Sequence, residues 1–400
     1  MRIVEVTMST PTAENFRGAT ALSYHIAKYR SSDVELHIFT LNYNGVTAER
    51  IAEIASELNC TITVVPQPKW LPRAVGSLAV RLMMRYPVFH YLTLPAATVE
   101  QIRALRPDGV WINGEELGRI ARQLRQYPIV HTLPDCESLY YRRSLELGDE
   151  LGAIRRSQQL RNRVMRPKYQ RMERHLMGGD RVHYHLVGDA DAQELRRICP
   201  RANAHFIRHP HYDVQHPFKE IDFGGGDRKV RLLLAGQNNL YMARRAQLLI
   251  DALVADAAAL AQGYEFTFLG RGWLAMAEQL RGAGYEVSEI EFAPDYISEV
   301  CRHDVQLTPI TIGTGTKGKV LDALANGLLV IGTPYAMENI AVRDGQECIT
   351  YSAESRVTEV LADLLQHPDH YERMATAGRD AVLRHHDRGA VASQFFSLFP

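Results

Sequence analysis

The segment TIGTGTKGKVLDALANGLLVIGT (residues 311–333) runs from a glycine-rich loop into an apolar helix and then an apolar strand. It follows DVQLTPI (304–310), which predicts another strand, so the succession is the strand, loop and helix of a doubly wound α/β domain. Gly313 and Gly315 let the backbone approach a ligand closely. A helix that begins near Thr316 directs unpaired N–H groups and a partial positive charge at that loop. The segment therefore predicts an anion site.

Two charged side chains extend this prediction. Lys317 adds a full positive charge at the start of the predicted helix, and Asp322 lies about a turn and a half into it. A carboxylate there can accept hydrogen bonds from sugar hydroxyls beside bound phosphates. Phosphate and ribose of a nucleotide would then both be held. The alternative is that the glycines only shape the loop and that Lys317 and Lys319 form a solvated helix start.

Short apolar runs alternate with helix-length amphipathic stretches through most of the chain, which predicts parallel sheets covered by helices on both faces. The predicted strands of the first half are 2–7, 35–41, 61–66, 109–113, 128–133 and 181–187. Those of the second half are 229–236, 264–270, 304–310, 328–333 and 347–352. The fold class predicted is α/β, with two Rossmann-like domains.

Domain boundaries follow from the break in this pattern. The stretch HPHYDVQHPFKEIDFGGGDRK (209–229) has prolines, three consecutive glycines and mixed charge, as an interdomain connection does. We expect an N-terminal domain over 1–207 and a C-terminal domain over 208–383. A last helix over 384–400 ends in apolar residues that need a surface to pack on, and the N-terminal domain is the candidate.

Composition excludes several classes of protein. Of 400 residues, 46% are hydrophobic and 23% charged, which is typical of a folded globular chain. The sequence has no run of eighteen uncharged apolar residues and no signal-peptide pattern, so we expect a cytoplasmic protein. The five cysteines include no CxxC pair, so we expect reduced thiols and no zinc site. No basic and aromatic face or recognition helix points to nucleic acid.

The net charge of zero conceals an asymmetry. Residues 1–205 have 28 Lys and Arg against 21 Asp and Glu, and the remainder has the opposite excess. A basic first half favours an anionic partner, such as a phosphate-bearing acceptor or a lipid surface. Two oppositely charged domains that attract each other are the alternative.

The segment GTGTKGKVLDALANGLLVIGT resembles the donor-nucleotide motif of GT-B glycosyltransferases, close to glycosyltransferase family 4. Weaker similarities extend over most of the chain, in LPDCESLYYRR (133–143), VGDADAQELRRICP (187–200), LLLAGQNN (232–239) and FTFLGRG (266–272). The resemblance implies two Rossmann-like domains that face each other across a cleft. The implied donor-binding residues are Gly236, Gly313, Thr314, Gly315, Thr316, Lys317 and Asp322.

The sequence departs from this motif at identifiable positions. Many family members have two glutamates eight positions apart, where this chain has Thr314 and Asp322. The first acid is lost and the second is one methylene shorter. HPHYD (209–213) replaces the usual Asn-Gly that follows entry into the second domain. These differences leave open how the sugar ring is held.

In the first domain the resemblance implies further roles. His131 lies near the end of the predicted strand PIVHTL, with Asp135 four residues later, and the resemblance implies a histidine near the donor sugar. We expect His131 and Asp135 to be the catalytic pair; a histidine bonded to backbone carbonyls at a strand end is the alternative. Arg17 and Gly18 occupy the position of the family's acceptor or diphosphate loop. No cofactor or metal is expected, because Lys317 and the helix end take up the leaving group's charge.

Residues 68–92 combine Trp70, Leu71, Met83 and Met84 with Lys69, Arg73, Arg81 and Arg85. This composition favours an interfacial amphipathic helix that contacts an anionic membrane at the inner face of the cell. A lid or core helix with a basic outer face is the alternative.

Two pairs of histidines, His183 with His185 and His209 with His211, have the spacing of metal ligands on a strand. No third ligand is near, so we interpret them as ordinary strand and loop residues.

The sequence as a whole predicts a metal-independent hexosyltransferase that retains anomeric configuration. It would move a sugar from a nucleotide-sugar donor to an acceptor glycan or lipid-linked sugar in bacterial cell-surface polysaccharide synthesis. Two alternatives stand beside this prediction. One is a catalytically silent GT-B subunit that supports a partner enzyme, and the other is a nucleotide-sugar epimerase.

Overall fold

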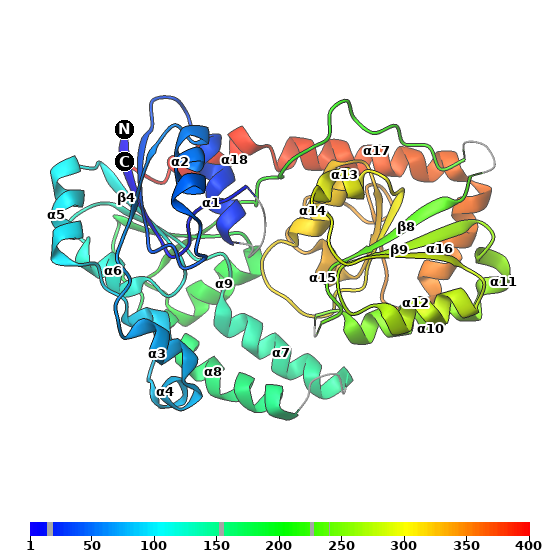
Figure 1. Ribbon diagram of the computed structural model, residues 1–400, viewed down its shortest axis with the longest axis horizontal. Coiled ribbons are helices and arrows are strands. Elements are labelled where there is room, and N and C mark those ends of the chain that lie inside the picture. Colours follow the sequence, from blue (N-terminus) through cyan, green and yellow to red (C-terminus); the bar gives the residue numbers. More distant parts are fainter. Residues whose placement is uncertain (14–18, 152–155, 225–227, 240) are drawn as a thin grey trace. The chain divides into compact units, whose positions relative to one another are not determined.

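The computed structural model describes residues 1–13, 19–151, 156–224, 228–239 and 241–400. Contacts within the chain divide it into two units (Figure 1). The N-terminal unit comprises Met1–Leu145, Arg155–Pro210 and Arg388–Pro400, and the C-terminal unit comprises Glu146–Ile154 and His211–Asp387. The main division therefore falls three residues after the 207/208 boundary expected from the sequence, and the returning segment begins at 388 instead of 384.

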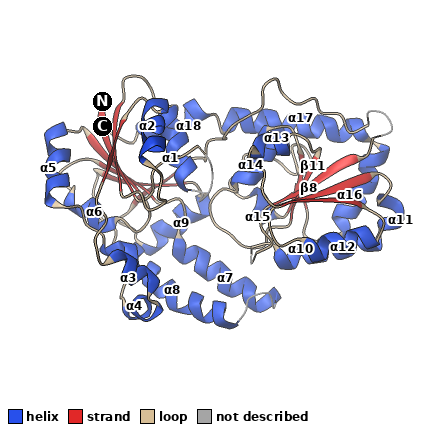
Figure 2. Ribbon diagram, in the orientation of Figure 1, coloured by secondary structure: helices blue, strands red, loops and turns tan. Residues whose placement is uncertain are grey.

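The N-terminal unit is built on a seven-stranded parallel sheet with helices on both faces (Figure 2). The strand order is β3-β2-β1-β4-β5-β6-β7. The strands are β1 (Arg2–Thr7), β2 (Glu35–Thr40), β3 (Thr61–Val64), β4 (Gly109–Asn113), β5 (Ile129–Thr132), β6 (Val182–Leu186) and β7 (Asn203–Phe206). The order reverses direction between β1 and β4, as in doubly wound sheets.

The helices of this unit follow the strands along the chain. They are α1 (Ala19–Lys28), α2 (Ala48–Glu57), α3 (Leu71–Gly76), α4 (Leu78–Met83), α5 (Ala96–Leu105), α6 (Gly118–Gln123), α7 (Glu137–Leu151), α8 (Arg156–Arg174) and α9 (Asp189–Ile198), with a short 3-10 helix at Val88–Tyr91. Alternation along β1 sends Val4 and Val6 to one apolar core and Ile3 to the other. Both faces of the sheet are thereby buried.

The last helix, α18 (Arg388–Phe396), belongs to the N-terminal unit. It packs beside α1, and the Phe395 ring is fully buried with its centroid 4.6 Å from that of Trp111 on β4. Phe396 and Phe399 join the same core. The apolar residues at the end of the chain therefore complete the core beneath the first strands.

The C-terminal unit has a six-stranded parallel sheet in the order β10-β9-β8-β11-β12-β13. Its strands are β8 (Val230–Ala235), β9 (Tyr264–Leu269), β10 (Glu286–Ile290), β11 (Val305–Thr308), β12 (Leu329–Gly332) and β13 (Ile349–Thr350). Its helices are α10 (Ala243–Ala255), α11 (Ala257–Leu260), α12 (Leu274–Gly282), α13 (Tyr296–Val300), α14 (Gly318–Ala325), α15 (Pro334–Met337), α16 (Ser355–Gln366) and α17 (Pro368–His385). The predicted α/β class with two Rossmann-like sheets is confirmed.

Helix α14 occupies a central place in this unit. Its residues Val320 to Ala325 are all buried, and it packs on α17 and on strands β11 and β12. The buried residues cover more than one face, which explains the nearly continuous apolar run VLDALA. The start of α14 is therefore fixed against the carboxyl end of β11.

Candidate functional site

The glycine-rich loops of the C-terminal unit gather at one edge of its sheet. Gly236 follows β8, Gly270 follows β9, and the loop 311–317 follows β11. All these strands are parallel, so the three loops leave the same carboxyl edge. Open α/β sheets bind ligands at this edge.

The loops after β8 and β9 touch through bare backbone. Gly236 and Gly270 have φ angles of 136° and 138°, and a Cβ atom on Gly270 would lie 2.1 Å from the Gly236 carbonyl oxygen. Gly236 donates a 2.8 Å hydrogen bond to the Leu269 carbonyl, and Trp273 Nε1 donates one of 2.8 Å to the Gly236 carbonyl. Only glycine fits at position 270, because the backbones of the two loops are in direct contact there.

The loop before α14 is held at both of its ends. The Thr311 amide and hydroxyl both donate to the Tyr241 carbonyl, at 2.8 and 2.9 Å. Near the other end, Asn339 Nδ2 donates a 3.0 Å hydrogen bond to the carbonyl of Gly315, whose φ is +61°. The conformation of the glycine loop is thus set by residues from the loops after β8 and β12.

Helix α14 begins at Gly318, with Lys317 as the N-cap residue. The helix start expected near Thr316 was two residues too early, because Lys317 has extended backbone angles (φ −85°, ψ 95°). The amides of Gly318 and Lys319 have no acceptor among the described residues. Unpaired amides and the positive end of the helix dipole therefore lie at the loop.

The Lys317 side chain folds back over the loop that precedes it. Its Nζ donates to the carbonyl oxygens of Thr314 and Gly315, at 2.9 and 3.0 Å. A Cβ atom on Gly313 would lie only 2.9 Å from Lys317 Cε, so a side chain at that position would displace the folded-back lysine. Thr314 and Thr316 are half-buried beside it. The ammonium group is thereby positioned at the start of α14.

Asp322 lies on the buried side of α14, one turn below its start. Its residue is only 4% exposed, and its Oδ1 has no hydrogen-bond partner. Burial raises the pKa of Asp322 to about 8; the Lys319 ammonium opposes this shift and the Asp213 carboxylate adds to it. Lys319 Nζ itself lies 4.3 Å from the ring centroid of Tyr296, whose hydroxyl is also buried without a partner. An unsatisfied carboxyl and a phenol thus lie beneath the anion-attracting helix start.

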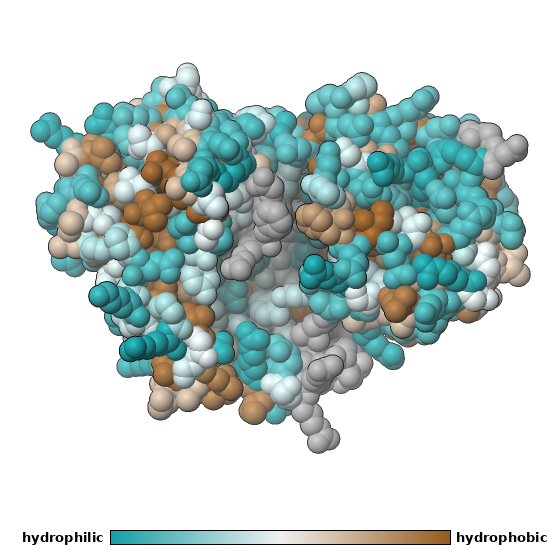
Figure 3. Space-filling view, in the orientation of Figure 1, coloured by the Kyte–Doolittle hydropathy of each residue, from teal (hydrophilic) through white to brown (hydrophobic). Residues whose placement is uncertain are grey.

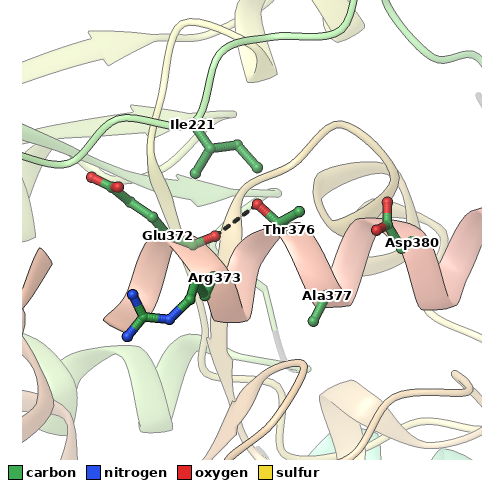
Figure 4. Close-up of a pocket in the computed structure, with 6 residues that line it drawn as sticks. All are labelled: Ile221, Glu372, Arg373, Thr376, Ala377 and Asp380. Atoms are coloured by element: carbon green, nitrogen blue, oxygen red, sulfur yellow. Dashed lines mark hydrogen bonds between the residues drawn. The ribbon is translucent and has the colours of Figure 1, made fainter. Parts of the chain in front are cut away.

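A pocket on α17 lies elsewhere in the same unit (Figure 4). Its volume is about 410 Å³, and along α17 the Thr376 hydroxyl donates a 2.8 Å hydrogen bond to the Glu372 carbonyl. Ile221, which also lines it, packs against Gly327 in the turn that leads into β12. The pocket is therefore near the amino edge of the sheet, opposite the glycine loops. Its lining residues are Ile221, Glu372, Arg373, Thr376, Ala377 and Asp380.

In the N-terminal unit, His131 is buried at the end of β5. Its Nε2 lies 2.8 Å from the Gly114 carbonyl oxygen, and its ring centroid is 5.6 Å from that of Tyr184. Burial lowers the pKa of His131 to about 4, and the Gly114 bond only partly opposes this. The imidazole is therefore neutral at pH 7 and bonded to backbone at a strand end.

Asp135 is half-buried in the turn between β5 and α7, so it follows the same carboxyl edge as His131. It lies close to Glu137, and burial together with the carboxylates of Glu115 and Asp135 raises the pKa of Glu137 well above its usual range. Arg17 and Gly18 lie outside the described residues.

The histidine pairs have local partners. His183 Nδ1 lies 3.0 Å from His205 Nε2, and His185 Nδ1 lies 3.2 Å from the Thr132 hydroxyl. His209 Nδ1 lies 2.8 Å from the Pro210 carbonyl. Within residues 1–13, 19–151, 156–224, 228–239 and 241–400, no group of three His, Cys, Asp or Glu side chains could hold a metal ion. The same residues contain no helix long and apolar enough to cross a membrane.

Several residues that shape the site were not among those predicted. Asn339 holds Gly315, Trp273 holds Gly236, and Tyr296 contacts Lys319. Each lies on a different element from the residue that it holds, so no local pattern identifies them. Lys319 carries a signal, because it stands two residues after Lys317 in the same motif.

Comparison with known proteins agrees with this arrangement. Residues 244–397 match the family model described as "Glycosyl transferase-like". HepE of Anabaena, solved in complex with UDP-glucose, superimposes with a TM-score of 0.62 at 14% identity, over 99% of this chain and 98% of that one. The chain has the GT-B fold.

Other GT-B structures are similar along their full length. A glycosyltransferase from Rickettsia africae has a TM-score of 0.66 at 10% identity, covering 100% of this chain and 97% of that one. WaaG, described as a glycosyltransferase involved in lipopolysaccharide biosynthesis, has a TM-score of 0.57 at 14% identity, covering 99% of both. No curated protein sequence matches the chain. The resemblance to GT-B enzymes predicted from the sequence is confirmed.

Proposed function

We propose that this protein is a glycosyltransferase that takes a sugar from a nucleotide-sugar donor. The observation that carries the proposal is the glycine loop 311–317, which leads from the carboxyl end of β11 into the start of α14 beside the Lys317 ammonium. The match of residues 244–397 to a glycosyl transferase-like family supports it. So does the likeness to HepE, whose structure contains UDP-glucose.

In this proposal the donor diphosphate binds against the start of α14. The unpaired amides of Gly318 and Lys319 donate hydrogen bonds to phosphate oxygens, and Lys317 supplies the compensating charge. Gly313 and Gly315 keep side chains out of the path of the diphosphate, while Thr314 and Thr316 offer hydroxyl groups. Gly236, on the neighbouring loop, leaves backbone exposed to the same ligand.

The nucleoside binds toward Asp322. Its unsatisfied Oδ1 is an acceptor for ribose hydroxyl groups. Those hydroxyls favour the ionised carboxyl, so nucleotide binding lowers the pKa of Asp322 and releases a proton in the pH range below about 8. A buried hydrogen-bond acceptor without a partner costs free energy in the unliganded protein, and this cost for Asp322 Oδ1 supports the proposed role.

During transfer, negative charge develops on the departing nucleoside diphosphate. The helix end and Lys317 stabilise it, so the proposed mechanism uses no metal. The family resemblance favours retention of anomeric configuration. In the N-terminal unit, Arg17 and Gly18 take part in acceptor binding, and His131 and Asp135 belong to the reaction site. With a pKa near 4, His131 acts as a neutral hydrogen-bonding group rather than as a proton carrier at pH 7.

We propose a bacterial cell-surface glycan or a lipid-linked sugar as the acceptor, with the reaction on the cytoplasmic side. The basic excess of residues 1–205 favours an acceptor that carries phosphate. The likeness to WaaG, which is involved in lipopolysaccharide biosynthesis, supports the same class.

The test is donor hydrolysis in the absence of acceptor. The purified chain is incubated with a panel of UDP-, GDP- and dTDP-sugars, and the release of free nucleoside diphosphate is followed. Slow release from one donor, lost in Lys317→Ala, is the expected result. Release from none of them, with nucleotide binding intact, would indicate a catalytically silent subunit, the alternative that Thr314 and the HPHYD segment leave open. Isomerised sugar without release would indicate an epimerase.

A further inference from the structure

Two segments that lie wholly or mainly in the N-terminal unit have no acidic residue over long distances. Between Glu57 and Glu100 the sequence contains Lys69, Arg73, Arg81 and Arg85 and no Asp or Glu. Between Glu150 and Glu173 it contains seven Arg and Lys, again with no Asp or Glu. Surfaces of folded proteins normally mix both signs, so these two segments are candidates for an anionic partner.

The fold brings the two segments together. Lys168 Nζ, on α8, donates a 3.0 Å hydrogen bond to the Leu82 carbonyl at the end of α4. One turn later, Arg171 donates a 2.9 Å bond to the Arg85 carbonyl. Helix α8 therefore caps the C-terminal end of α4, and Figure 1 draws α3, α4 and α8 together at one end of the unit.

The outward face of α4 is apolar. Leu78, Leu82 and Met83 are 62%, 48% and 79% exposed, and Ala79 beside them is exposed as well. Positions 78, 79, 82 and 83 share one side of a helix, and α4 has no buried residue. Helix α4 itself is therefore not a core helix, whereas Leu71 and Ala74 of α3, in the same segment, are buried in the core of the unit.

Further apolar and basic side chains accompany this face. Trp70, which precedes α3, and Leu160, on α8, are 38% and 64% exposed, and Arg161 and Arg163 are exposed near Leu160. Within the described chain, none of Lys69, Arg73, Arg81 and Arg85 has an acidic partner within 4 Å. Figure 3 shows hydrophobic and hydrophilic surface side by side at this end of the unit. The positive charge is therefore available to a partner.

We propose that the α4 surface, formed by α3, α4 and the exposed side of α8, docks on an anionic lipid bilayer. Leu78, Leu82 and Met83 enter the interfacial region of the bilayer, and the surrounding Arg and Lys side chains bind lipid phosphates. A bilayer needs only shallow insertion of a few side chains combined with basic charge, which is what this surface provides.

This inference concerns a different unit from the proposed donor site and does not depend on sugar transfer. If both hold, the docked surface brings the N-terminal unit to acceptors that are anchored in the same bilayer. Nucleotide binding and vesicle binding can be measured separately, so failure of one is distinguishable from failure of the other.

The experiment is co-sedimentation of the full chain with vesicles of phosphatidylcholine alone or mixed with phosphatidylglycerol. At about 0.1 M salt, where the Debye length is about 10 Å, we expect binding to the anionic vesicles at least tenfold tighter than to the neutral ones. The triple variant Leu78→Ser, Leu82→Ser, Met83→Ser should lose at least tenfold in affinity. The exposed position of these three side chains predicts an unchanged melting temperature.

Two further variants keep the test sharp. Lys69→Gln, Arg73→Gln, Arg85→Gln removes three exposed charges and should weaken binding by about fivefold per charge. The matched control is the double variant Leu274→Ser, Phe292→Ser, which should bind vesicles as the native chain does. Leu274 and Phe292 lie in the C-terminal unit and are 60% and 64% exposed. Absence of binding to anionic vesicles would overturn the proposal. Equal binding by the native chain and the triple serine variant would do the same, because it would leave only non-specific electrostatic adhesion.

Discussion

Replacing Asp322 by asparagine tests the electrostatics beneath α14. Burial raises the pKa of this carboxyl from 3.8 to about 8. A raised pKa means that the folded state binds the proton more tightly than the unfolded state does. This stabilisation is complete below pH 3.8 and is lost progressively as the pH rises toward 8. Asparagine does not titrate, so its variant does not lose stability in this way.

The size of the effect follows from the pKa shift. Each pH unit between 3.8 and 8 changes the free energy of unfolding of the native chain, relative to Asp322→Asn, by about 1.4 kcal/mol. Between pH 5 and 7 the free energy of unfolding of the variant should therefore rise by about 3 kcal/mol relative to that of the native chain. For a unit of this size that is a widening of the melting-temperature difference by about 5–10 °C.

The assay is thermal unfolding of both chains at half-unit steps from pH 5 to 8. Asp251→Asn, an exposed aspartate on α10, is the control and should track the native chain at every pH. Parallel curves for Asp322→Asn and the native chain would refute the reasoning, since they would mean that Asp322 is ionised throughout. A saturating nucleoside diphosphate should reduce the difference, because the bound ribose favours the ionised carboxyl.

Three other predictions concern the two units separately. Gly270→Ala should destabilise the C-terminal unit by about 4 kcal/mol or more, because its Cβ would lie 2.1 Å from the Gly236 carbonyl oxygen. The control Gly282→Ala should not destabilise the unit, because no atom lies within 4 Å of the added Cβ. Thermal melting of both variants checks this prediction. Phe395→Ala should cost the N-terminal unit about 3–5 kcal/mol, measured by chemical unfolding, because its ring is fully buried; a loss below about 1 kcal/mol would mean that α18 is not part of the core. Titration of His131 followed by NMR should give a pKa near 4. The native chain and His131→Gln should therefore show the same pH dependence of donor hydrolysis above pH 6. A His131 titration near pH 6.5 would contradict the burial described.

Most of the fold could be predicted from the sequence because the central strands are short apolar runs that alternate with helix-length amphipathic stretches. The strands that were missed are β7 (NAHF) and β10 (EVSEI), which are edge strands with polar side chains. An edge strand buries only part of its surface, so it needs no apolar run and leaves a weak signal. The strand predicted over 347–352 is only Ile349–Thr350 in the structure, again at an edge.

The candidate site was predictable in its chemistry but not in its details. The order of strand, glycine loop, lysine and carboxylate located it, since those residues are adjacent in the sequence. The two-residue error in the helix start, and the return of Lys317 onto the carbonyls of Thr314 and Gly315, depend on backbone angles that the residue types do not specify. The bond from Asn339 to Gly315 joins positions 24 residues apart, so it required the folded chain.

The central claim is that a diphosphate binds at the start of α14 beside Lys317, and calorimetry of a nucleoside diphosphate and of its nucleoside tests it most directly. Lys317→Ala should weaken diphosphate binding by about tenfold to a hundredfold and leave nucleoside binding unchanged. This factor corresponds to the free energy that a charge-assisted hydrogen bond contributes to binding. Lys229→Ala is the control and should change neither affinity, because Lys229 precedes β8 at the opposite edge of the sheet. Equal losses for nucleotide and nucleoside in Lys317→Ala, or no loss for either, would contradict the account.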